Sequence, residues 1–241
     1  MKQNESTVTL PPGVSLQRVG QVLLEAWEVG GNQWNDSPLQ LQEAGPGNSP
    51  PPLPQDALEL FKLLAERKVS YLLVGGIAML TYVQGRNTRD VDLLLSVEAL
   101  SAVPELHIEE RADFFIKASF RSLRVDLLLT TNPLFKLVQE RFATMHRFAE
   151  REVPAATVDG LLVLKLYALP SLYRQLDWDR VYLYESDVKQ LLARYRPNLE
   201  PIYALLAHHI LASDLRELQK MIAEAQQRQQ KMGRRPRTGE T

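Results

Sequence analysis

A short apolar run closed by two adjacent glycines is the feature that most restricts how this chain can fold. Tyr71–Val74 is apolar and short enough for a buried strand, and Gly75 and Gly76 follow it directly. Apolar residues at helical spacing then resume over 77–84, before Gly85. This order predicts a strand, a tight turn and a helix. We therefore expect the first half of the chain to be mixed α/β.

The segments around this unit follow the same pattern. The stretch that starts at Asp56 predicts a helix with Asp56 as its N-cap, because apolar residues follow at helical spacing. The run Asp-Val-Asp-Leu-Leu-Leu at 90–95 predicts a second, central strand, and 96–103 a short helix. Further strands are expected at 106–111, 113–119 and 122–129. Helices are expected at 133–144, 158–169, 186–195, 199–211 and 213–230.

These segments divide the chain into four expected parts. Residues 1–55 form a proline-rich, partly disordered arm, because the run GPGNSPPPLP at 45–54 fits neither a helix nor a central strand. A short helix at 15–27 is possible within it on helical spacing. Residues 56–131 form a core and 132–230 an α-helical C-terminal domain. Residues 231–241 are a basic tail, which is either solvated or in contact with RNA. The expected fold class is α+β, a mixed sheet flanked by helices and followed by a helical region.

Composition excludes several kinds of chemistry. The 241 residues contain no Cys, so a disulfide framework, a Cys-ligated zinc site, an iron–sulfur cluster and a thiol nucleophile are all excluded. Lys and Arg number 28 against 29 Asp and Glu, a net charge of -1, which argues against a wholesale polyanion binder. The N-terminus lacks the apolar core of a signal peptide, and no apolar stretch is long enough to span a bilayer. We expect a cytoplasmic protein.

Three carboxylates are the candidates for chemistry. Asp90 and Asp92 point to the same side of a strand, where they repel each other and lose hydration unless a cation compensates. They either mark a solvated strand entrance or bind a metal. Asp126 lies in a similar run, Val-Asp-Leu-Leu-Leu, and reaches the same patch if the two strands are neighbours. Three oxygen ligands at one sheet edge suit Mg²⁺.

The glycine pair has two interpretations. Glycines between a strand and a helix allow the backbone to approach a ligand closely, and the helix N-terminus offers N–H groups to a phosphate. Gly75 and Gly76 are thus either a plain turn or a phosphate-binding turn. The sequence contains neither the dinucleotide-binding glycine fingerprint nor a P-loop, so a phosphate site here would be of another kind.

Taken together, these motifs resemble the core signature of the polymerase-beta-like nucleotidyltransferase superfamily. The matching residues are Val74-Gly-Gly, then Arg86-Asn-Thr-Arg-Asp-Val-Asp92, and later Asp126. Within that superfamily the chain is most similar to abortive-infection and type IV toxin nucleotidyltransferases, through the segment Leu-Lys-Leu-Tyr-Ala at 164–168. Asp187 falls near an Asp of those proteins, although the preceding residues depart from their pattern. The resemblance covers about 70–200.

The resemblance implies a nucleotidyltransferase-like fold and a Mg²⁺-dependent transfer of a nucleoside monophosphate from an NTP to an acceptor hydroxyl. It makes Asp90, Asp92 and Asp126 the catalytic, metal-binding residues. The nucleotide-binding residues that it implies are Gly75, Gly76, Arg86, Thr88, Lys165 and Asp187. For Lys165, a lysine that reaches water from an apolar helix is the alternative.

The acceptor and the biological role stay open. By the resemblance, the acceptor is an RNA 3′ end or a protein, and the chain is a toxin that is relieved by an antitoxin partner. One alternative is an inactive nucleotide-binding or interaction protein with the same fold. Another is a nucleotidyltransferase that modifies a small molecule, such as an antibiotic.

Overall fold

The computed structural model describes residues 53–83, 88, 90–148 and 151–233. The expected arm up to residue 52, its short helix, Arg86 and the end of the basic tail lie outside the described residues. The chain divides into two compact units, the first within 1–139 and 144–155 and the second within 140–143 and 156–241.

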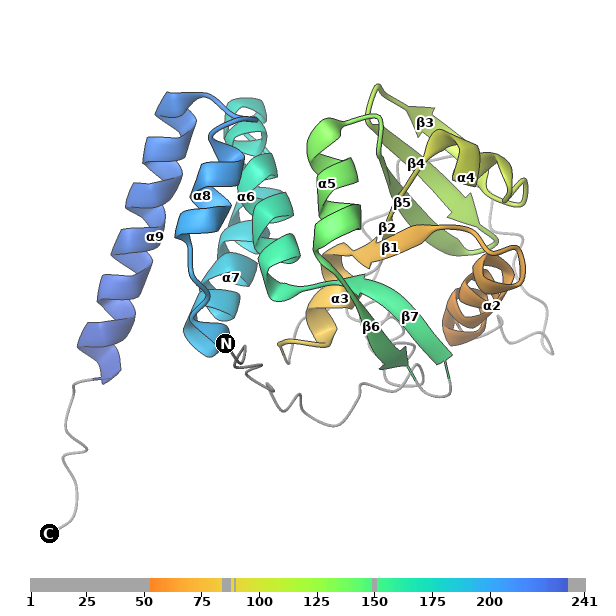
Figure 1. The fold of residues 1–241 in the computed structure, drawn as a ribbon, viewed down its shortest axis with the longest axis horizontal. Helices are drawn as coiled ribbons and strands as arrows, with labels where there is room; N and C mark the ends of the chain where they lie inside the picture. Colours follow the sequence, from red (N-terminus) through yellow and green to blue (C-terminus); the bar gives the residue numbers. More distant parts are fainter. Residues whose placement is uncertain (1–52, 84–87, 89, 149–150, 234–241) are drawn as a thin grey trace, which may run out of the picture. The chain divides into compact units, whose positions relative to one another are not determined.

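The first unit is built on a mixed sheet (Figure 1). Its helices are α2 (Leu53–Glu66), α3 (Gly75–Leu80), α4 (Val97–Ser101) and α5 (Pro133–Arg141). Its strands are β1 (Tyr71–Val74), β2 (Asp90–Leu95), β3 (His107–Arg111), β4 (Phe115–Phe120), β5 (Leu123–Leu129), β6 (Ala143–Phe148) and β7 (Arg151–Ala156). They follow the order β3-β4-β5-β2-β1-β7-β6 across the sheet. The expectation that 90–95 forms a central strand is confirmed, because β2 lies in the middle, parallel to β5 and antiparallel to β1.

One face of the central strands is wholly apolar and forms the core. Val91, Leu93 and Leu95 alternate with the polar start of β2, and each is completely buried. Helix α2 packs on this side, since the Phe61 ring stacks on Tyr71 at 6.2 Å between centroids. The alternation fixes which residues remain for the opposite face, where the carboxylates lie.

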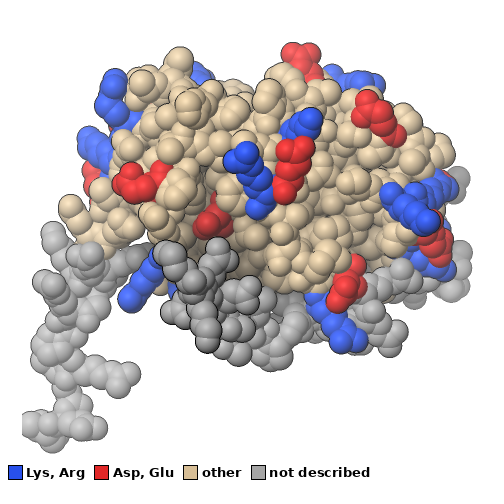
Figure 2. All heavy atoms as spheres, viewed as in Figure 1, with Lys and Arg blue, Asp and Glu red and all other residues tan. Residues whose placement is uncertain are grey.

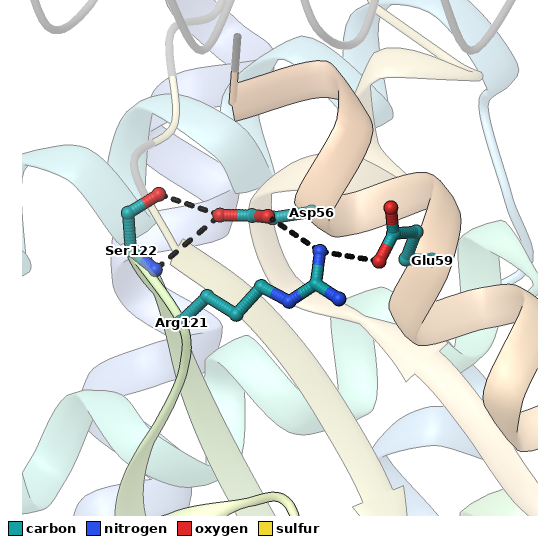
Figure 3. A network of polar contacts seen from close by, with 4 residues as sticks. All are labelled: Asp56, Glu59, Arg121 and Ser122. Carbon is teal, nitrogen blue, oxygen red and sulfur yellow. Dashed lines mark hydrogen bonds and ion pairs between the residues drawn. The ribbon is translucent and has the colours of Figure 1, made fainter. Parts of the chain in front are cut away.

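Asp56 joins α2 to the β4–β5 turn (Figure 3). Its carboxylate is buried and accepts hydrogen bonds from the Ser122 backbone N–H at 3.3 Å and hydroxyl at 2.6 Å. Arg121, which turns the chain with a φ of 56°, forms ion pairs with Asp56 and Glu59. The expected N-cap role of Asp56 is wrong: α2 begins at Leu53, and Asp56 in its first turn instead anchors the start of β5.

The hairpin of β6 and β7 was not expected, because only helices were predicted after residue 132. The predicted helix at 133–144 ends at Arg141, and the chain then returns to the sheet. Strand β7 runs parallel to β1, with Ala155 opposite Leu73. Pro154 in the middle of β7 removes a backbone donor and is a signal against a strand inside a sheet.

The second unit is helical, as expected. Its helices are α6 (Val158–Gln175), α7 (Trp178–Tyr195), α8 (Glu200–Leu206) and α9 (Ala212–Gly233). The Thr157 hydroxyl caps α6 by accepting from the Gly160 N–H at 3.2 Å, and the C-cap residue Leu176 adopts the left-handed conformation. The expected α+β fold class, a mixed sheet with flanking helices followed by a helical region, is confirmed. No helix in the described part of the chain is long and apolar enough to cross a membrane.

Candidate active site

The strand register places the three predicted carboxylates on one face of the sheet. Strands β2 and β5 are parallel neighbours, with Asp92 opposite Asp126 and Asp90 opposite Arg124. Residues paired across a ladder point to the same side, as do residues two apart on one strand. The condition for Asp126 to share the patch of Asp90 and Asp92, that their strands are neighbours, is therefore met. We call these three residues the carboxylate face.

Asp92 is held by the glycine turn. The Gly76 backbone N–H donates a hydrogen bond to Asp92 Oδ2 at 3.1 Å. Gly75 has a φ of 60°, and a β-carbon at this position would lie 1.9 Å from Asp92 Oδ2. Only glycine combines that backbone conformation with so close an approach. The turn after β1 therefore positions a carboxylate, and its predicted phosphate contact stays a prediction.

Asp90 has an oxygen that the described residues leave without a hydrogen bond. Oδ1 of Asp90 is buried, and no hydrogen-bond partner for it exists among the described residues. Arg124 on the neighbouring strand forms an ion pair with this oxygen: its Nε lies 3.6 Å away, beyond hydrogen-bond distance. A buried carboxylate oxygen without a donor is costly and is suited to a cation.

A second cation borders the same face from the other side. Lys117 on β4 lies opposite Asp126 in the antiparallel β4–β5 ladder. Its ammonium group is 2.5 Å from Glu110 Oε2 on β3. The acidic face is thus flanked by Arg124 and Lys117, each with a carboxylate partner.

The donor chemistry of the carboxylate face fits a hard divalent cation. All three side chains offer oxygen ligands, which Mg²⁺ prefers, and Asp90 Oδ1 has capacity left. In the described residues, no group of three His, Cys, Asp or Glu side chains is arranged as a metal site. The register of β2 and β5 brings the three carboxylates to one face. Their role as metal ligands stays a prediction.

Lys165 and Asp187 form a buried ion pair in the second unit. The Lys165 Nζ lies 2.6 Å from Asp187 Oδ2, and their side chains are 4% and 1% exposed. The ammonium group also lies over the Tyr184 ring, 4.4 Å from its centroid. The alternative in which Lys165 reaches water is therefore wrong. The predicted nucleotide contacts of both residues stay untested by this geometry.

The remaining predicted loop residue that the structure describes is Thr88. Its hydroxyl donates to the Asp90 backbone oxygen at 3.3 Å, so it supports the start of β2. Arg86 lies outside the described residues. In the second unit, Arg174 forms an exposed ion pair with Asp214 at 3.0 Å.

Sequence reasoning missed a buried polar pair beside α3. Tyr82 follows α3, and its hydroxyl lies 2.8 Å from His146 Nε2 on β6, with the rings in an edge-to-face arrangement. Burial lowers the pKa of His146 below its ordinary value. The two groups are joined by a hydrogen bond whose direction depends on the tautomer of the His146 ring. Nothing in the sequence indicated this contact, because His146 is a single histidine on a strand that was not predicted.

Several solved structures of nucleotidyltransferases are similar to this chain at low sequence identity. No family model and no curated protein match the sequence. ANT(2″)-Ia in complex with adenylyl-2″-tobramycin has 14% identity and a TM-score of 0.48, over 64% of this chain and 95% of that one. An antigenic nucleotidyltransferase-like protein from Paracoccidioides brasiliensis has 16% identity and a TM-score of 0.42, over 67% and 91%. These likenesses concern the fold alone.

Proposed function

We propose that the chain is a Mg²⁺-dependent nucleotidyltransferase that moves a nucleoside monophosphate from an NTP to an acceptor hydroxyl. The observation that carries this proposal is the register of Asp92 opposite Asp126, with Asp90 on the same side of β2. Three carboxylates on one sheet face, beside a glycine turn that touches one of them, favour a site for metal and phosphate. A plain structural role does not require three acidic groups on one face of two neighbouring strands.

In the proposed reaction, each residue of the site has its own role. The acceptor oxygen attacks the α-phosphorus, the bond to pyrophosphate breaks, and pyrophosphate leaves. Asp126 accepts the proton of the attacking hydroxyl at a carboxylate oxygen. Asp90 and Asp92 would hold Mg²⁺, which when bound would neutralise charge on the triphosphate and favour the ionised acceptor. Gly76 keeps the Asp92 carboxylate in place through its N–H.

The test is label transfer from α-labelled NTPs in the presence of Mg²⁺. Acceptors are bacterial tRNA, bacterial protein and small molecules with free hydroxyls, because acidic and basic side chains are interspersed on the face in Figure 2 and favour no single class. The wild type is compared with Asp92→Asn and with Asp113→Asn, the same chemical change in an exposed loop. We expect transfer by the wild type and by Asp113→Asn, and none by Asp92→Asn.

Two outcomes decide against turnover. NTP binding without transfer to any acceptor would favour the inactive nucleotide-binding protein. Absence of both binding and transfer in the wild type would contradict the proposal as a whole. Because binding and transfer are measured separately, the two outcomes are distinguishable.

We extend the proposal to a toxin that modifies an RNA 3′ end or a protein and is relieved by an antitoxin. Its support is the resemblance of the segment around Lys165. Induced expression in bacteria is expected to arrest growth for the wild type and for Asp113→Asn, and not for Asp92→Asn. Normal growth with soluble, abundant wild-type protein would contradict the toxin role and leave the enzymatic proposal to the transfer assay.

A further inference from the structure

Arg124 occupies a special place on the carboxylate face. It lies on β5 two residues before Asp126, so both side chains point to the same side of the sheet. It is also the register partner of Asp90 on the neighbouring strand. The cationic side chain of Arg124 therefore lies on the same face as the three carboxylates and next to Asp90.

The contact between Arg124 and Asp90 is close enough for charge compensation but too long for a hydrogen bond. Its Nε lies 3.6 Å from Asp90 Oδ1, the same oxygen that is buried and lacks a hydrogen bond among the described residues. The Arg124 side chain is 41% exposed, so a rotation of its long side chain carries the guanidinium away from Asp90 at little cost in buried area. Another cation can therefore replace the Arg124 guanidinium as the partner of Asp90.

A divalent ion and a guanidinium compete for the same carboxylate oxygen. If a divalent ion took Asp90, the guanidinium would lose this ion-pair partner and would be repelled by the positive charge of the ion. Its planar fork of donors matches phosphate oxygens, which arrive with the nucleotide. The guanidinium of Arg124, displaced from Asp90 by the metal, can therefore bind the phosphates of the nucleotide.

We propose that Arg124 is an exchangeable counter-ion, which neutralises Asp90 in the metal-free protein and turns to the nucleotide phosphates when a divalent ion takes Asp90. This inference rests on the proposed function of the same site. It makes metal binding and nucleotide binding cooperative, because each ligand completes the change that the other needs. Arg124 is a positioning residue for the substrate in this scheme.

Lys117 provides a matched control on the same face. It is also a cation, it lies opposite Asp126, and it is held by Glu110 at 2.5 Å. Removal of its charge changes the general electrostatic field near the carboxylates, as removal of Arg124 does. It does not remove a counter-ion of Asp90.

The experiment measures binding rather than activity. Mn²⁺ binding to the full chain is followed by electron paramagnetic resonance, and the affinity of a fluorescent ATP analogue is measured in EDTA and in saturating Mg²⁺. We compare the wild type with Arg124→Gln, Arg124→Lys and Lys117→Gln, after circular dichroism confirms that each is folded. The ratio of the two nucleotide affinities gives the coupling between metal and nucleotide.

Arg124→Gln is expected to bind Mn²⁺ about twofold to fivefold more tightly than the wild type, as suits a half-exposed ion pair. Its coupling ratio is expected to fall by at least the same factor. Arg124→Lys should keep the wild-type Mn²⁺ affinity because the charge remains, and lose part of the coupling because the fork is gone. Lys117→Gln should change both quantities by less than about twofold.

Three results would overturn the inference. Mn²⁺ affinity and coupling in Arg124→Gln equal to those of the wild type would do so while leaving the proposed function intact. If Lys117→Gln changed the Mn²⁺ affinity and the coupling as much as Arg124→Gln does, the effect would come from the loss of any positive charge near the carboxylates, and not from exchange of Arg124 at Asp90. A wild-type protein that binds neither Mn²⁺ nor nucleotide would overturn both this inference and the proposed function.

Discussion

Gly75 and Asp92 approach each other so closely that no side chain fits between them. A β-carbon on Gly75 would lie 1.9 Å from Asp92 Oδ2 and 2.2 Å from its Cγ. This contact links the turn after β1 to the central strand of the sheet. The glycine turn and the carboxylate face are therefore one structural unit, and a change in the first must move the second.

Gly75→Ala is predicted to displace Asp92 and to destabilise the fold. A non-glycine residue at a φ of 60° costs on the order of 1–3 kcal/mol, and the clash adds to it. Urea unfolding measures the stability, and Mn²⁺ binding measures the displacement of the carboxylate. Gly160→Ala is the control, because its β-carbon would crowd Phe142 at 2.7 Å and no carboxylate. If folded Gly75→Ala bound Mn²⁺ as the wild type does, the glycine turn would not be needed to position Asp92 for metal binding.

Asp126→Asn tests the proton acceptor. The side chain is largely buried, so the isosteric amide keeps the packing of β5 while it removes the base. We predict that the transfer rate falls by about 10²–10⁴-fold, as for the loss of a general base. Single-turnover rates give the measurement, with Asp113→Asn as the matched substitution. A transfer rate within threefold of the wild-type rate would show that Asp126 is not the proton acceptor.

The buried pair of Lys165 and Asp187 allows stability to be separated from function. Asp187→Ala removes the carboxylate partner of a buried cation and is predicted to cost about 3–5 kcal/mol. The double variant Lys165→Met/Asp187→Leu should be close to the wild type in stability, because apolar replacement removes both buried charges together. Urea unfolding measures each.

The same double variant tests the predicted nucleotide role of these two residues. If Lys165 contributes charge to a bound triphosphate, the stable double variant should bind the ATP analogue more weakly than the wild type. Wild-type affinity in a stable double variant would leave the pair with a structural role only.

His146 is predicted to make stability fall with decreasing pH. Burial lowers its pKa in the folded protein below the ordinary 6.5, so the unfolded chain binds this proton more tightly. The contribution of the neutral ring is complete above that value and is lost as the pH falls below it. Urea unfolding from pH 8 to 5 should show a steeper loss for the wild type than for His146→Gln. Parallel curves would contradict this assignment.

Tyr82→Phe complements the pH experiment. It keeps the ring contact with His146 and removes only the hydroxyl, whose hydrogen bond measures 2.8 Å. The expected loss is about 1 kcal/mol at pH 8. No loss at that pH would show that the hydrogen bond contributes nothing to stability.

The sequence was most informative where a single local pattern decided the structure. Strand β2 has the predicted bounds, because an apolar run after Asp92 leaves one choice of faces. The β6–β7 hairpin was missed because Pro154 is a signal against a central strand, and the parallel pairing with β1 is a tertiary effect. The sequence named the three carboxylates and the glycine pair as candidates, and only the structure shows the contact between Gly76 and Asp92. The pairing of Arg124 with Asp90 depends on a register between distant strands, which no local pattern contains.

The most direct test of the central claim is a crystal structure of the chain grown with Mn²⁺ and a non-hydrolysable NTP, with anomalous scattering recorded at the manganese edge. The account predicts anomalous density ligated by Asp90 and Asp92, with Asp126 beside it and the phosphates against the same face. Manganese bound elsewhere, or a carboxylate face without metal when nucleotide is present, would contradict it.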